Sequence, residues 1–309
     1  MFQIIKSDTK INFAGMFKYA GILSTVLVLI SLGLIFSKMK YGVDFRGGAE
    51  LQTKFTEKVD LNKLRSELST AGFNGISVQS IGELSSNEYL IKVPGNEENL
   101  NQVTEDVTAA LTSHWKEGVE IRKVDIVGPK AGAELRQSGF LAMLWALLAI
   151  MVYIGLRFDF KYSPGAIIAL FHDVTIVLGI FALTGTEFTL QTVAAILAVI
   201  GYSVNDTVIV YDRVREHEAK FVGKKLVDHI NNATNETLSR TILTSGTTLF
   251  VSISMLLGGG LAIRDFFMAF TMGIIIGTYS SIFVAAPITL VFDKYRKKSE
   301  SNTSGTVNA

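Results

Sequence analysis

The sequence contains no cysteine, which excludes disulfide bonds and thiol-based catalysis. It has only four histidines, and no two of them have the spacing of a metal-binding pair. His217 and His229 lie in a charged segment, where we expect them to be solvated. No Gly-x-x-x-x-Gly-Lys-Ser/Thr motif is present, and a net charge of +1 would not attract nucleic acid. We therefore predict no cofactor, no metal site, no nucleic-acid partner, and neither ATPase nor other enzymatic activity in this chain.

Apolar residues are what the chain has in excess. The hydrophobic fraction is 49% and the mean hydropathy is +0.36, which is typical of a membrane protein with a soluble part. Six runs are long enough to cross a bilayer. These predicted spans cover residues 19–36, 139–157, 164–184, 191–211, 241–257 and 266–292. No small-x-small cleavage site follows the first span, so we predict an uncleaved helix rather than a signal peptide.

Residues 37–138 form a polar block between the first two spans, and their pattern predicts a small α+β domain. Strands are predicted over residues 49–55, 76–81, 88–93 and 119–127. Asp60 can cap a first helix that ends at Gly72, and an apolar stripe from Leu100 to Leu111 predicts a second helix. The order βαββαβ is the ferredoxin-like arrangement. No catalytic constellation is visible in this block.

Lysine and arginine gather on one side of the predicted membrane. The basic segments are the N-terminus (1–18), Arg157 with Lys161, a loop over 212–240, and the tail 293–309. The short loops on the opposite side are nearly free of basic residues. We therefore expect both termini to be cytoplasmic and the domain at 37–138 to be extracytoplasmic. The residues after Ser299 are expected to form a disordered tail.

Ionisable residues interrupt the apolar spans at three places. Asp206 lies roughly 9 Å inward from Asp212 along a helix, where an ionisable group costs on the order of 3 kcal/mol. His172 and Asp173 interrupt the third span at a similar depth, so the two carboxyls can share one polar cluster. The third place is the fifth span, which begins just after Arg240. The hydroxyl residues that repeat behind it on one predicted helix face are Thr244, Thr248 and Ser252.

These residue types suit proton handling. A carboxyl group in a low dielectric holds its proton more tightly than in water, so it can load and release a proton near neutral pH. A nearby arginine favours the ionised form, so movement of Arg240 relative to Asp206 would switch proton affinity. Simpler interpretations stay open. Asp206 and Asn205 can act as hydrogen-bonding contacts between helices, the His172–Asp173 pair can support packing, and Arg240 can be a positively charged flank of its span.

Five segments follow one another in order along the chain. They are Gly42-Val43-Asp44-Phe45-Arg46-Gly47-Gly48, Phe171-His172-Asp173, Gly201-Tyr202-Ser203-Val204-Asn205-Asp206-Thr207, Asp212-Arg213-Val214-Arg215-Glu216 and Ser239-Arg240-Thr241. Together they resemble the SecF family, the smaller membrane subunits of the SecD–SecF accessory complex of bacterial protein export. Each segment alone is moderately specific, whereas all of them in order with six spans are highly specific.

The resemblance implies a six-helix membrane protein, half of a transporter of the resistance-nodulation-division type, with one extracytoplasmic ferredoxin-like domain. It implies a heterodimer with SecD in the bacterial inner membrane that associates with the SecYEG channel and with preproteins. It also implies that the proton-motive force, or a sodium gradient, assists export. Within this family the intramembrane carboxylate corresponds to Asp206 and the arginine linked to ion movement to Arg240.

The predicted site is larger than these two residues. Asp173 is the third residue of the predicted proton relay, after Asp206 and Arg240. The supporting polar residues are His172, Asn205, Thr244 and Thr248, and the family motif at the entry to the exported domain is Asp44, Arg46, Gly47 and Gly48. A small-molecule or lipid exporter of the same superfamily is the alternative function, although an exporter should have a larger domain with a substrate cleft. A scaffold without an ion role is the third hypothesis, and it predicts that neutralising Asp206 is harmless.

Overall fold

A computed structural model describes residues 9–73, 76–81, 87–94, 99–114, 118–158, 161–260 and 263–306. Within these residues, six helical segments are long and apolar enough to cross a membrane. They are α1 (Phe13–Lys38), α5 (Pro129–Arg157), α6 (Ser163–Thr184), α7 (Leu190–Lys220), α8 (Leu226–Gly258), and a last segment built from α9 (Arg264–Ser280), the π-helix η2 (Ser281–Ala285) and α10 (Ala286–Thr306). The prediction of six spanning helices with a small domain between the first two is confirmed.

A four-stranded antiparallel sheet forms the small domain. Its elements are β2 (Gly48–Phe55), α3 (Leu61–Thr70), β3 (Ser77–Ile81), β4 (Glu88–Val93), α4 (Leu100–His114) and β5 (Val119–Val127). The strand order is β3-β4-β2-β5, which is the ferredoxin-like topology predicted from the sequence. Asp60 caps α3 by accepting hydrogen bonds from the backbone N–H groups of Asn62 and Lys63.

Three short elements join this domain to the helices. The one-turn helix α2 (Val43–Arg46) lies directly before β2. The strand β1 (Lys40–Tyr41) follows α1 and pairs in parallel with β6 (Glu187–Phe188), which lies between α6 and α7. The entrance to the domain is therefore held by backbone hydrogen bonds to a distant part of the chain.

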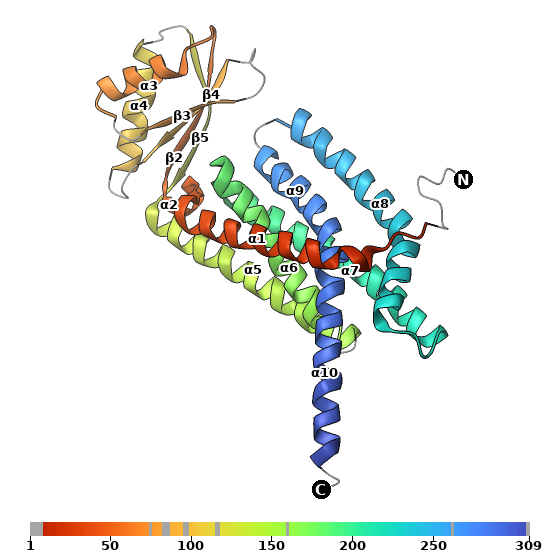
Figure 1. The fold of residues 1–309 in the computed structure, drawn as a ribbon. Helices are drawn as coiled ribbons and strands as arrows, with labels where there is room; N and C mark the ends of the chain where they lie inside the picture. The colour runs from red at the N-terminus through yellow and green to blue at the C-terminus, as the bar shows by residue number, and fades with distance from the viewer. Residues whose placement is uncertain are drawn as a thin grey trace.

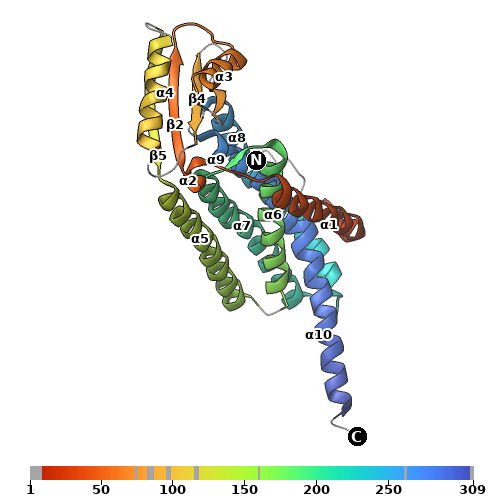
Figure 2. The same ribbon diagram turned by 90° about the vertical axis from the view of Figure 1, so that its left-hand side faces the viewer.

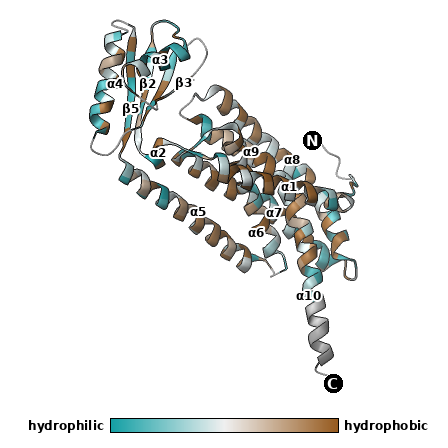
Figure 3. Cartoon of the chain, turned by 60° about the vertical axis from the view of Figure 1, so that its left-hand side comes forward, coloured by the Kyte–Doolittle hydropathy of each residue, from teal (hydrophilic) through white to brown (hydrophobic). Residues whose placement is uncertain are grey.

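Alternating burial along the strands explains why this block folds as a separate unit. Leu51 and Ile91 point from β2 and β4 into one apolar core, and Leu64 and Leu111 close that core from α3 and α4. The domain lies beyond one end of the helices, and α10 projects from the opposite end (Figures 1 and 2). Brown, apolar residues predominate along the helices, whereas teal residues are frequent on the sheet domain (Figure 3).

Small residues bring the central helices together. A Cβ atom at Gly273 of α9 would overlap the side chain of Val199 on α7, and one at Gly165 of α6 would overlap the Ala285 carbonyl. Helices in lipid pack mainly through such close backbone approaches, since burial from water does not drive them together. α6, α7 and α9 therefore form the centre of the membrane part, with α5 and α8 on opposite flanks (Figure 1).

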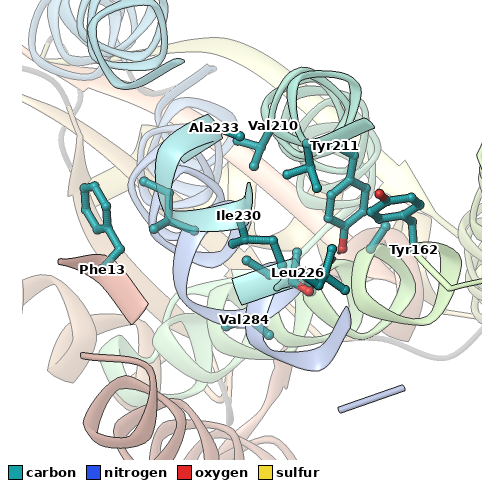
Figure 4. Packing of buried hydrophobic residues seen from close by; sticks show 14 of the residues in the cluster. Phe13, Tyr162, Val210, Tyr211, Leu226, Ile230, Ala233 and Val284 are labelled. Atoms are coloured by element: carbon teal, nitrogen blue, oxygen red, sulfur yellow. Dashed lines mark hydrogen bonds between the residues drawn. The ribbon is translucent and has the colours of Figure 1, made fainter. Parts of the chain in front are cut away.

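The segment 212–240 was expected to be a loop, and this was wrong. α7 continues to Lys220 and α8 begins at Leu226, so most of the segment is helical. Its apolar residues keep helical spacing, and Leu226 and Ile230 pack against Val210 of α7 (Figure 4). The charged residues lie on the outer faces of the same helices.

The two histidines of this segment are not solvated, contrary to expectation. His217 and His229 are 6% and 3% exposed, because the α7–α8 turn folds back on itself. The His217 ring accepts or donates a hydrogen bond with Glu236 at 2.9 Å. The disordered tail expected after Ser299 was also wrong within the described residues, since α10 continues as helix to Thr306.

Candidate ion-coupling site

Asp206 is fully buried in the middle of α7 and is only partly satisfied. Its Oδ2 accepts a hydrogen bond from Ser245 Oγ on α8 at 3.2 Å. Its Oδ1 is buried and has no hydrogen-bond partner among the described residues. Arg240 precedes Ser245 on α8, and its positive charge acts on the Asp206 carboxyl. A buried carboxyl with an open oxygen can take up a proton or contact a small cation.

Asp173 is also fully buried, but its environment is different. Its Oδ2 accepts hydrogen bonds from Ser203 of α7 at 2.5 Å and from Ser280 of α9 at 2.7 Å. Its Oδ1 lies 2.9 Å from Nδ1 of His172. The imidazole ring of His172 stacks on Tyr279, and its Nε2 is buried without a partner among the described residues.

The two carboxyls do not share a ligand, but neighbouring residues connect their surroundings. Ser203, which contacts Asp173, lies one helical turn before Asp206 on α7. Thr278 of α9 donates to Ser245 at 2.8 Å, two residues before Ser280. The two carboxyls are therefore connected through shared helices, α7 and α9, and not through an unbroken chain of hydrogen bonds among the described residues.

The supporting residues predicted from the sequence differ in whether they contact a carboxyl group. Thr244 and Thr248 donate only to backbone carbonyls of their own helix, and Asn205 is exposed although its neighbour Asp206 is buried. No salt bridge joins Arg240 to Asp206 in the described part of the chain, and the Arg240 side chain is exposed. The roles proposed for these residues stay predictions.

Sequence reasoning missed three hydroxyl residues that contact the carboxyls, and also Thr278, which donates to one of them, Ser245. The three are Ser203, Ser245 and Ser280. Ser245 was visible as the residue four after Thr241 and seven before Ser252, since all three are buried on one face of α8. Ser280 gave no such signal, because its contact with Asp173 depends on how α9 packs against α6.

Comparison with known proteins places this arrangement in a family. Residues 107–295 match the family described as protein export membrane protein SecD/SecF, C-terminal, and residues 33–59 match the SecD/SecF GG motif. The protein translocase subunit SecF of Rickettsia rickettsii is 42% identical over 300 residues, which is 96% of this chain and 97% of that protein. The chain belongs to the SecF family. The SecF subunit of Calditerrivibrio nitroreducens is 39% identical and equally well covered, with 96% of this chain and 98% of that protein aligned.

Solved structures agree with the family. The crystal structure of SecDF, a translocon-associated membrane protein from Thermus thermophilus, has a TM-score of 0.84 and 32% identity over 94% of this chain. A second SecDF structure, in a super-membrane-facing form, has a TM-score of 0.71 and 33% identity over 98% of this chain. This SecF-family chain spans only 40% and 41% of those two proteins, so SecDF contains a larger additional part.

The GG motif of this SecF-family chain forms the junction between α1, the sheet domain and α5. Asp44 Oδ2 accepts from the backbone N–H of Leu190 at 2.9 Å, which ties the motif to the start of α7. Gly47 and Gly48 have φ angles of 77° and 141°. A Cβ at Gly47 would lie 2.6 Å from Cα of Pro129, so only glycine fits against the start of α5. Arg46 is exposed and does not take part in this packing.

A partly buried lysine links the sheet domain to the membrane helices. Lys92 of β4 pairs with Glu50 of β2 at 3.3 Å and with Glu187, which lies between α6 and α7. Burial raises the pKa of Glu50, although Lys92 opposes the effect. Burial alone would lower the pKa of Lys92, but its hydrogen bonds to Glu187 and Glu50 outweigh that effect and raise it. The lysine is therefore charged when the domain is docked.

Proposed function

We propose that this chain is an ion-coupled subunit of a bacterial protein translocase that assists export across the cytoplasmic membrane. It would act in a heterodimer with SecD, together with the SecYEG channel, on preproteins in transit. The proton-motive force, or a sodium gradient, would supply the free energy: one charge crossing 100 mV is worth about 2.3 kcal/mol. Both termini would be cytoplasmic, and the sheet domain would be extracytoplasmic.

The observation that carries the proposal is the open oxygen of Asp206. A fully buried carboxyl with one hydroxyl donor and one unsatisfied oxygen is costly as a packing contact, so its presence points to a role in ion movement. Arg240 is the counter-charge that would switch the carboxyl between its protonated and ionised states. SecD would complete the ion path, because the related SecDF structures are more than twice as long as this chain.

Export of a reporter preprotein tests this function in cells depleted of the native protein and supplied with Asp206→Asn. The expected result is loss of export at normal membrane level and normal co-purification with SecD. Asp228→Asn is the matched control, because Asp228 is exposed in the first turn of α8. Unimpaired export by Asp206→Asn would leave the carboxyl as a packing contact and refute the ion-coupled function.

A further inference from the structure

The two buried carboxyls differ in how completely they are satisfied. Asp206 has a single hydroxyl donor, from Ser245, and one open oxygen. Asp173 has two hydroxyl donors on one oxygen and the imidazole of His172 on the other. Hydrogen bonds to a carboxylate favour its ionised form, and a carboxylate is an acceptor only. Asp173 is therefore the more completely hydrogen-bonded carboxyl of the two, and Asp206 is the one with an open oxygen.

The partners of Asp173 also come from the helices that arrange Asp206. Asp173 on α6 accepts hydrogen bonds from Ser203 of α7 and from Ser280 of α9. Ser280 lies directly before the π-helix at 281–285. Two residues earlier on α9, Thr278 donates to Ser245, which donates to Asp206. π-helical segments are rare and often occur at functional sites. The hydrogen bonds of Asp173 therefore hold α7 and α9, the two helices that carry Asp206 and Thr278.

From this geometry we infer that Asp173 is not a second proton carrier but a fixed anionic positioning residue for Asp206. The inference rests on the proposed function, in which Asp206 is the carrier. Among the described residues, the other ionisable groups at the pair are His172 at Asp173, with Tyr279 stacked on its ring, and Arg240, whose charge acts on Asp206. In this arrangement Asp173 joins α6 to α7 and α9 through its hydrogen bonds to Ser203 and Ser280.

The test is labelling with dicyclohexylcarbodiimide, which reacts with protonated carboxyl groups in apolar surroundings. Membrane vesicles that contain the chain in its complex are labelled across a pH series, and mass spectrometry locates the adduct. We expect labelling of Asp206 that declines as the pH rises, and no labelling of Asp173. Equal labelling of both carboxyls would overturn the inference and leave the proposed function intact. An unlabelled Asp206 would overturn both.

Two variants separate ionisation of Asp173 from mere inaccessibility. Ser280→Ala removes one donor, so Asp173 should now become labelled at low pH. Asp173→Asn removes the fixed charge, so the pH of half-maximal Asp206 labelling should fall by roughly one unit. An unmoved midpoint would show that Asp173 carries no charge and would overturn the inference. If Asp173→Asn does not assemble, Ser280→Ala decides alone, and continued absence of Asp173 labelling in that variant overturns the inference.

Discussion

Ser245 and Thr244 are adjacent on α8, but only the hydroxyl group of Ser245 contacts Asp206. Ser245 donates to the carboxyl and accepts from Thr278, so it joins α7 to α9 through α8. Thr244, its neighbour, bonds to the backbone of its own helix. In a medium of low dielectric, the direction of one side chain decides whether a polar group acts on a buried carboxyl or only on its own helix.

Ser245→Ala should reduce export at least about tenfold without loss of assembly. Hydrogen bonds to charged groups contribute roughly 1.5–3 kcal/mol, and the substitution removes the side-chain donor of Asp206. The measurement is the rate of reporter export, normalised to membrane level. Thr247→Ala serves as the control, because Thr247 is exposed and its hydroxyl contacts only backbone carbonyls. Equal effects of the two substitutions would contradict the assigned role of Ser245.

Helix elements in this protein are organised by small residues at their contacts. α9 crosses α7 where Gly273 meets Val199, and again where a Cβ atom added at Gly277 would lie 3.0 Å from Cβ of Ser203. At the end of the same helix Ser280 contacts Asp173, and a π-helix follows at residues 281–285. The geometry of the polar site is thus a consequence of helix packing.

Gly273→Ala should destabilise the protein by about 1–3 kcal/mol, because a methyl group overlaps Val199 and forces α7 from α9. The melting temperature of the detergent-solubilised chain would fall. Gly201→Ala is the matched control on α7: nothing lies within 4 Å of its added Cβ, and alanine favours the helix. A melting temperature that is unchanged in Gly273→Ala would show that this contact can relax.

At the scale of the whole molecule, three features couple the sheet domain to the membrane helices. The GG motif fixes the covalent junction, and the parallel pairing of β1 with β6 adds a backbone link. Lys92 then bridges Glu50 within the domain to Glu187 between the helices. Any ion-driven movement of α6 and α7 therefore reaches the domain through defined contacts.

Lys92→Met should loosen the domain by about 1–3 kcal/mol, since Glu50 and Glu187 then remain partly buried without their cation. The chain has no cysteine, so spin labels can be placed at Ser69→Cys and Leu183→Cys without interference. The distance distribution between the labels should broaden in Lys92→Met. Lys123→Met is the control, because the partner of Lys123 is Asp125 within the same strand. Identical distributions in all three proteins would rule out a coupling role.

The same link predicts how domain docking depends on pH. The contacts of Lys92 with Glu187 and Glu50 raise its pKa. The contribution of Lys92 to the stability of docking is therefore complete below the ordinary lysine pKa of 10.5, and it is lost as the pH rises through the raised pKa of the docked state. Docking also raises the pKa of Glu50, so this residue opposes docking once the pH exceeds its ordinary value of 4.5. Broadening of the spin-label distances should therefore begin at strongly alkaline pH, and a Lys92→Met protein should lack this alkaline transition.

The sequence alone determined the elements and the family. Hydrophobic runs predicted six spans, period-2 alternation predicted the strands, and an ionisable residue in an apolar run singled out Asp206, because each of these signals is local in the chain. The helical continuation through 212–240 was missed, because its charged residues masked the apolar stripe that packs on α7. Burial of His217 and His229 was missed for the same reason.

Only the tertiary structure decided how the polar residues are combined. Asp206 and Asp173 are both fully buried, yet their hydroxyl partners come from three other helices, α7, α8 and α9, which no local periodicity predicts. The link from Lys92 to Glu187 likewise joins residues 95 positions apart. Local patterns determine which segments enter the membrane, whereas the partner of each buried polar group depends on helix crossings set by close contacts between distant residues.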